Sequence, residues 1–121
     1  MGTTRTIMGT STFLKEKNKN IQIIGAQPTD NSKIPGIRKW SPEFLPKIFN
    51  PEKVDSVIEV SETEAREMTK RLAKEEGVFA GMSSGGAVAV ALKLAKTIDS
   101  GVIIAIICDR GDRYLSSDLF E

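Results

Sequence analysis

Residues 102–108 form the longest apolar run of the chain, with the sequence Val-Ile-Ile-Ala-Ile-Ile-Cys. Side chains alternate between the two faces of a strand, so a strand built from this run would be apolar on both faces. Such strands are typical of parallel sheets that carry helices on each side. The run therefore predicts a buried strand of an α/β fold, and at seven residues it is far too short to cross a bilayer.

The amino-terminal half alternates helical and strand patterns. Apolar residues with helical spacing cover residues 3–17, and β-branched runs at 21–26 and 54–60 predict two strands. Residues 29–53 contain four prolines and little periodicity, which predicts a long structured loop. Helix followed by strand is one half of an α/β repeat.

Two further helices are expected before the apolar run. Ser61 and Glu64 have the spacing of a capping box, and Gly77 is a suitable stop for the helix that follows. Residues 83–98 are rich in alanine and predict another helix. The alternating order indicates one domain with the doubly wound layers of an α/β fold, which 121 residues are long enough to build.

Composition narrows the classes of function. Seventeen basic residues nearly balance sixteen acidic ones and are scattered, so we expect neither a nucleic acid nor a membrane as partner. The chain has no histidine, the commonest metal ligand and general base, and we expect no metal site. The single cysteine, Cys108, and an amino terminus without a signal-peptide pattern both predict a cytoplasmic location.

Three segments stand where an α/β sheet places ligands. Residues 2–6, Gly-Thr-Thr-Arg-Thr, could surround a phosphate at the positive end of a helix, or form an ordinary threonine-capped helix start. Residues 81–86, Gly-Met-Ser-Ser-Gly-Gly, fit ligand contact or close helix packing. Residues 108–113 place Cys108 after the apolar run, where it would face the ligand crevice or lie buried and inert, ahead of a charged turn.

These segments occur in register with two more motifs, Gly-Ala-Gln-Pro at 25–28 and Ile-Pro-Gly-Ile-Arg at 34–38. Together the five resemble the cysteine synthase B branch of the fold-type II pyridoxal-phosphate enzymes, over nearly the whole chain. The resemblance implies a three-layer, doubly wound, mostly parallel sheet of the tryptophan synthase β type, here incomplete. It also implies pyridoxal 5'-phosphate as cofactor and a β-replacement in which sulfide or another sulfur donor displaces the acetate of O-acetylserine to give L-cysteine. A homodimer is expected for the full-length form.

The resemblance assigns site residues one by one. The loop that holds the cofactor phosphate corresponds to Gly2, Thr3, Thr4, Arg5 and Thr6. Ser83 is expected to contact the cofactor and Cys108 to lie beside its pyridine nitrogen. A neutral thiol there does not force the ring nitrogen to become a cation, which suits β-elimination better than transamination. Three residues are expected near the substrate, with surface roles as the alternative for the charged ones: Gly36, Arg38 and Asp109.

The chain departs from the family pattern in two ways. The Schiff-base lysine and the loop that grips the substrate carboxylate lie upstream of the phosphate loop in the family, so no catalytic residue is assigned here. Residues 1–121 are therefore expected to be the carboxyl-terminal part of the cofactor-binding domain, a fragment inactive by itself or a non-catalytic module that binds a partner. Arg5 replaces a glycine and is expected to obstruct the phosphate pocket, or else to supply a counter-charge from outside it. Missing strands would leave an exposed edge, an aggregation liability.

Overall fold

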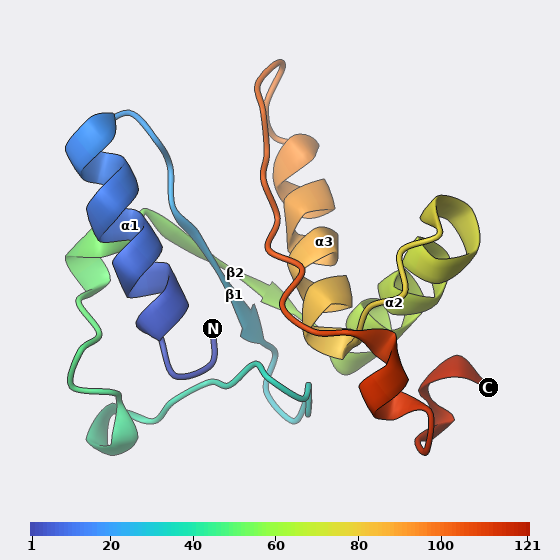
Figure 1. Cartoon of the computed structure of the whole chain (residues 1–121). Coiled ribbons are helices and arrows are strands. Elements are labelled where there is room, and N and C mark those ends of the chain that lie inside the picture. The colour runs from blue at the N-terminus through green and yellow to red at the C-terminus, as the bar shows by residue number, and fades with distance from the viewer.

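Helices and strands alternate in a computed structural model that describes residues 1–121. The elements, in chain order, are α1 (Arg5–Lys17), β1 (Ile24–Pro28), β2 (Ser56–Val60), α2 (Glu62–Glu76) and α3 (Met82–Ala95). Figure 1 shows the two strands between α1 and α3, with α2 beyond α3. Short 3-10 turns interrupt the loops at Pro42–Phe44, Pro51–Lys53, Gly111–Tyr114 and Asp118–Phe120. The order of elements confirms the α/β class. No helix is long and apolar enough to cross a membrane.

The two strands form a parallel pair, in which Ile24 lies opposite Ser56 and Pro28 opposite Val60. β1 begins three residues later than the β-branched run predicted, and it extends two residues further, to Pro28. The carboxylate of Asp55 accepts the N–H of Ile23, the residue before the strand. This N–H is therefore bonded to a side chain and not to the neighbouring strand. The strand boundary was therefore set by a contact between distant residues.

Residues 102–108 do not form the predicted strand. The segment has no ladder partner, and the side chains of Val102 and Ile104 are 90% and 83% exposed. It runs beside α3 in Figure 1, with Ile103 and Ala105 half-buried. A strand exists only when a neighbour pairs with its N–H and C=O groups, and β1 and β2 pair only with each other. The prediction of a buried strand was wrong for this reason.

The ends of α2 confirm the sequence interpretation. The Ser61 hydroxyl accepts the N–H of Glu64 at 3.1 Å, and the Glu64 carboxylate accepts the N–H of Ser61 at 2.8 Å, which completes the capping box. Gly77 ends the helix in the left-handed conformation, with φ 67°. Local hydrogen bonding thus determines where this helix begins and ends.

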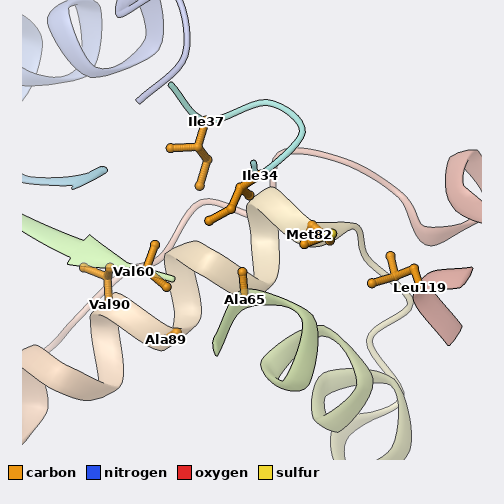
Figure 2. Packing of buried hydrophobic residues seen from close by; sticks show 8 residues of the cluster. All are labelled: Ile34, Ile37, Val60, Ala65, Met82, Ala89, Val90 and Leu119. Atoms are coloured by element: carbon orange, nitrogen blue, oxygen red, sulfur yellow. The ribbon is translucent and has the colours of Figure 1, made fainter. Parts of the chain in front are cut away.

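The core lies where α2 and α3 meet the loop after β1. Gly85 of α3 lies so close to Thr69 and to the carbonyl of Ala65 that a Cβ atom would overlap both. Close helix packing is therefore one role of the glycines at 81–86. Figure 2 shows the eight buried apolar side chains of the core: Ile34, Ile37, Val60, Ala65, Met82, Ala89, Val90 and Leu119. Two of the eight come from the long proline-containing loop, so this loop is packed, as predicted.

Candidate cofactor site

The phosphate-loop candidate leads directly into α1, which begins at Arg5. Thr4 is the N-cap residue, in the left-handed conformation at φ 66°, and its side chain makes no capping hydrogen bond. The first turn carries no acidic residue, so neither a cap nor a carboxylate satisfies the N–H groups that begin the helix. These N–H groups and the helix dipole together favour an anion at this end.

The hydroxyl of Thr4 is a second indication of an anion site at the start of α1. Thr4 is 4% exposed, and its Oγ1 atom is the one buried side-chain nitrogen or oxygen of the chain with no hydrogen-bond partner. Leaving a buried hydroxyl unpaired costs about 1–3 kcal/mol, which an acceptor at this position would recover. A phosphate oxygen is such an acceptor, so the residues present fit a phosphate group.

Arg5, the charged residue of this loop, lines a hollow that does not include Thr4. Arg5 is exposed and lines an open hollow of about 340 Å³ together with Thr3 and Lys47. Thr6 is exposed as well. Neither Gly2 nor the buried Thr4 lines this hollow.

The loop at 34–38 brings the phosphate loop to the start of α3. Gly36 has φ 90°, and a Cβ atom on it would lie 3.1 Å from Cβ of Ser83. On its other side, a Cβ atom on Gly2 would lie 2.8 Å from the Gly36 carbonyl oxygen. The Trp40 indole donates a hydrogen bond to the Gly2 carbonyl at 2.8 Å, which fixes the approach. Three of the five sequence motifs therefore meet at Gly36.

Cys108 also lies at the place where these motifs meet. Its thiol lies 3.0 Å from the hydroxyl of Ser83, and it is exposed and unpaired with any other cysteine. Ser83 is only 5% exposed, and it belongs to the first turn of α3, whose N-cap residue Gly81 has no side chain for capping. The structure thus brings together Gly2, Gly36, Ser83 and Cys108, four of the residues predicted for the site.

The carboxylate of Asp109 is engaged within the protein. It accepts hydrogen bonds from the Ser84 hydroxyl at 2.5 Å, from the Tyr114 hydroxyl at 2.7 Å and from the Gly81 N–H at 3.1 Å. Burial by itself would raise the pKa of Asp109, but these hydrogen bonds outweigh it and hold the pKa below its usual value. Burial and the same carboxylate raise the pKa of Tyr114 to about 12.

The other two predicted substrate residues share a groove that does not include Asp109. Gly36 and Arg38 line one open groove of about 1030 Å³ formed by residues 28–44. The Arg38 guanidinium stacks over the Trp40 ring at 5.4 Å. Asp109 does not line this groove.

Sequence reasoning missed Ser84 and Tyr114. Ser84 is fully buried, and its hydroxyl accepts the backbone N–H of Cys108 at 3.1 Å. The available signal was the position of these two residues: Ser84 lies inside the motif at 81–86, and Tyr114 directly follows the motif at 108–113. Neither position in the sequence indicates a hydrogen bond to the Asp109 carboxylate, which lies 25 residues after Ser84 and five residues before Tyr114.

Known proteins are similar to this chain in sequence. The chain is 54% identical to cysteine synthase B of Pseudomonas aeruginosa over 121 residues and 52% identical to cysteine synthase B of Escherichia coli over 120 residues. All or nearly all of this chain is covered in these matches, but only 40% of each relative. The chain thus spans about two fifths of the length of the relatives it matches.

Solved structures agree in fold. Cysteine synthase from Entamoeba histolytica superposes with a TM-score of 0.89 at 34% identity, over 99% of this chain and 38% of that one. An O-ureido-L-serine synthase superposes with a TM-score of 0.87 at 32% identity, over 99% of this chain and 40% of that one. The profile of the pyridoxal-phosphate dependent enzymes matches residues 1–109. Since that match covers most of the chain, the protein belongs to the family of pyridoxal-phosphate dependent enzymes.

Proposed function

We propose that the amino end of α1 binds the phosphate of pyridoxal 5'-phosphate. The single observation that carries the proposal is the buried, unpartnered hydroxyl of Thr4 at an uncapped helix start. The residues that would hold the phosphate are those of the loop and first turn: Gly2, Thr3, Thr4, Arg5 and Thr6. Arg5 lines the hollow outside Thr4, which favours a counter-charge from outside over obstruction.

The ring of the cofactor would lie toward Ser83 and Cys108. Their hydroxyl and thiol are 3.0 Å apart, and both can donate or accept a hydrogen bond. When bound, pyridoxal phosphate supplies an electron sink for reactions at the α-carbon of an amino acid. A neutral donor beside the ring nitrogen favours β-replacement over transamination, and Cys108 would have this role.

The proposed activity is that of a cysteine synthase, in which a sulfur donor such as sulfide replaces the acetate of O-acetylserine. The names of the relatives and the site residues support it. Gly36 and Arg38 line a groove next to Ser83 that a small substrate could enter, and we assign these two residues to the substrate side. Residues 1–121 would supply the carboxyl-terminal part of the cofactor-binding domain, and the lysine that binds the cofactor would come from outside them. A cytoplasmic homodimer is proposed for the complete enzyme.

Binding can be tested on the chain itself. Trp40 is the only tryptophan and donates to the Gly2 carbonyl, so its fluorescence reports on the phosphate loop. We expect saturable quenching by 4'-deoxypyridoxine 5'-phosphate, an analogue without the aldehyde that would modify surface lysines. Inorganic phosphate should compete. Absence of any saturable response would contradict the proposed phosphate site.

Activity can be tested in a chimera. Residues 1–121 would replace the aligned residues of Pseudomonas aeruginosa cysteine synthase B, to which they are 54% identical. We expect the chimera to form cysteine from O-acetylserine and sulfide, and Arg5→Gly in it to change the rate by less than about tenfold, since the guanidinium lies outside the buried site. A chimera that folds and binds cofactor but makes no cysteine would favour the non-catalytic alternative.

A further inference from the structure

We propose that Ser84, Asp109 and Tyr114 form a clamp that positions Cys108 against Ser83 at the start of α3. The inference rests on the proposed cofactor site, because it concerns how the thiol of that site is held. It assigns Asp109 to positioning the thiol, where its sequence motif had suggested contact with the substrate. None of the three clamp side chains touches the proposed ligand; each acts through Cys108.

The hydroxyl of Ser84 is the centre of the clamp. It donates to the Asp109 carboxylate at 2.5 Å and accepts the backbone N–H groups of Cys108 at 3.1 Å and of Asp109 at 3.4 Å. Ser84 is fully buried, so these bonds are shielded from water. Because Ser83 is the preceding residue of the same helix, fixing the backbone of Cys108 to Ser84 brings its thiol within 3.0 Å of the Ser83 hydroxyl.

Asp109 joins the clamp to the helix end and to the turn that follows. One carboxylate oxygen accepts the N–H of Gly81, the N-cap residue of α3, at 3.1 Å. The other oxygen accepts the Tyr114 hydroxyl at 2.7 Å. The carboxylate therefore has three donors, and hydrogen bonds to a charged group are the stronger kind. Gly81 has no room for a side chain, because a Cβ atom there would overlap the Asp109 carboxylate.

Little else holds Cys108. The residues before it, 102–107, have no strand partner and two of their side chains are over 80% exposed. After it, the chain is tied by the bridge between Ala80 and Arg110 and by the Gly111 N–H, which donates to the Phe79 carbonyl at 3.0 Å. These contacts hold the turn but not the thiol. No strand pairing fixes the backbone before Cys108, so the position of Cys108 depends on Ser84 and Asp109.

The experiment compares Asp109→Ala, Asp109→Asn and Ser84→Ala in the full chain. Amide hydrogen exchange by NMR reports directly on the Cys108 N–H that Ser84 accepts. We expect the Cys108 amide to exchange about tenfold faster in Asp109→Ala and Ser84→Ala. Each variant loses one hydrogen bond to a charged group, and a loss of that size shifts the local opening equilibrium by about tenfold. Asp109→Asn keeps an acceptor for Ser84 and Gly81 and should restore most of the protection. Unchanged exchange in Asp109→Ala would overturn the proposal.

A second readout concerns the thiol. Cys108 is the only cysteine, so its modification by a thiol reagent is specific, and 4'-deoxypyridoxine 5'-phosphate should protect it. In Asp109→Ala we expect the protection to be lost while the Trp40 fluorescence response to the analogue remains. Retained thiol protection would contradict positioning by Asp109. A wild-type chain without the Trp40 response would instead contradict the phosphate site, and the clamp would be judged on amide exchange alone.

Two control variants separate the clamp from general effects. Asp112→Ala removes an exposed carboxylate of the same turn that pairs with Arg110 at 2.7 Å, and it should leave both readouts unchanged. Val90→Ala leaves a cavity in the core of α3 and should lower the unfolding temperature without releasing the Cys108 amide. If Val90→Ala accelerates Cys108 exchange as much as Asp109→Ala, the effect is one of overall stability and the proposal fails.

Discussion

Ser83 Oγ and Cys108 Sγ lie 3.0 Å apart although 25 residues separate them in the chain. The contact joins the first turn of α3 to the segment that follows the long apolar run. Gly36 approaches Ser83 as well, since its φ of 90° and lack of a side chain let the loop pass close by. The chemistry proposed here depends on this crossing of three segments.

Gly36→Ala tests that crossing. Alanine at φ 90° is strained, and its Cβ would press on Ser83 at 3.1 Å, so we expect the Ser83–Cys108 contact to be disrupted. The strain should cost about 1–3 kcal/mol of unfolding free energy, measured by urea denaturation. Gly77→Ala is the matched control, because Gly77 also has a positive φ but has nothing within 4 Å of the added atom. Only Gly36→Ala should alter the rate at which Cys108 reacts with a thiol reagent; equal rates in both variants would contradict the expectation.

Thr4→Val replaces the unpaired hydroxyl by a methyl group of similar size. We expect weaker phosphate binding by about tenfold, with an unfolding free energy unchanged or raised by about 1 kcal/mol, because no hydrogen bond within the protein is lost. Thr12→Val provides the contrast. The Thr12 hydroxyl bonds to the Met8 carbonyl at 2.8 Å and accepts from Lys53 at 2.6 Å, so this variant should be destabilised and bind phosphate normally. A destabilised Thr4→Val would mean that its hydroxyl has a partner after all.

Glu64 makes the stability depend on pH. The hydrogen bond from Lys93, followed by that from the Ser61 N–H, holds the pKa of Glu64 below its ordinary value of 4.5. A carboxyl whose pKa is lower in the folded state stabilises the fold above the unfolded pKa, and this contribution is lost as the pH falls through the folded pKa. Glu64→Gln keeps an acceptor for the capping box but removes the charge. The wild type should therefore unfold at a higher temperature than the variant at about pH 7, and this advantage should disappear as the pH falls through the folded pKa of Glu64, below 4.5. The difference should stay below about 1 kcal/mol, since the pair is partly exposed. An advantage independent of pH would show that the charge has no role.

We expect Ile104 to promote self-association of the apolar segment. Its side chain is 83% exposed on an extended segment whose backbone pairs with no strand, an arrangement that promotes edge-to-edge pairing. Ile104→Lys should reduce self-association measured by sedimentation at increasing concentration, without loss of unfolding free energy. Ile103→Lys, at the neighbouring half-buried position, should destabilise the chain instead. If both variants behave alike, the two side chains do not face opposite ways.

Local patterns allowed a large part of the molecule to be predicted. The capping box of Ser61 and Glu64, the stop at Gly77 and the packed loop after β1 were confirmed, because the interactions that decide them lie within a few residues or follow from composition. The family was also recognisable, because five motifs occur in register. The assignments of individual site residues to cofactor and substrate remain predictions.

The buried strand at 102–108 was predicted from its own residues and is absent, since pairing is a property of two segments and not of one. The shift of β1 has the same origin, in the contact between Asp55 and Ile23. The clamp on Cys108 was not predicted at all, because a serine, an aspartate and a tyrosine become partners only when the chain brings them together. The sequence by itself determined the helices, the capping box and glycine stop of α2, and the family motifs, which depend on near neighbours. Only the tertiary structure decided which groups are buried, paired or left unpaired, because the free energy of a polar group depends on what lies within hydrogen-bond distance of it.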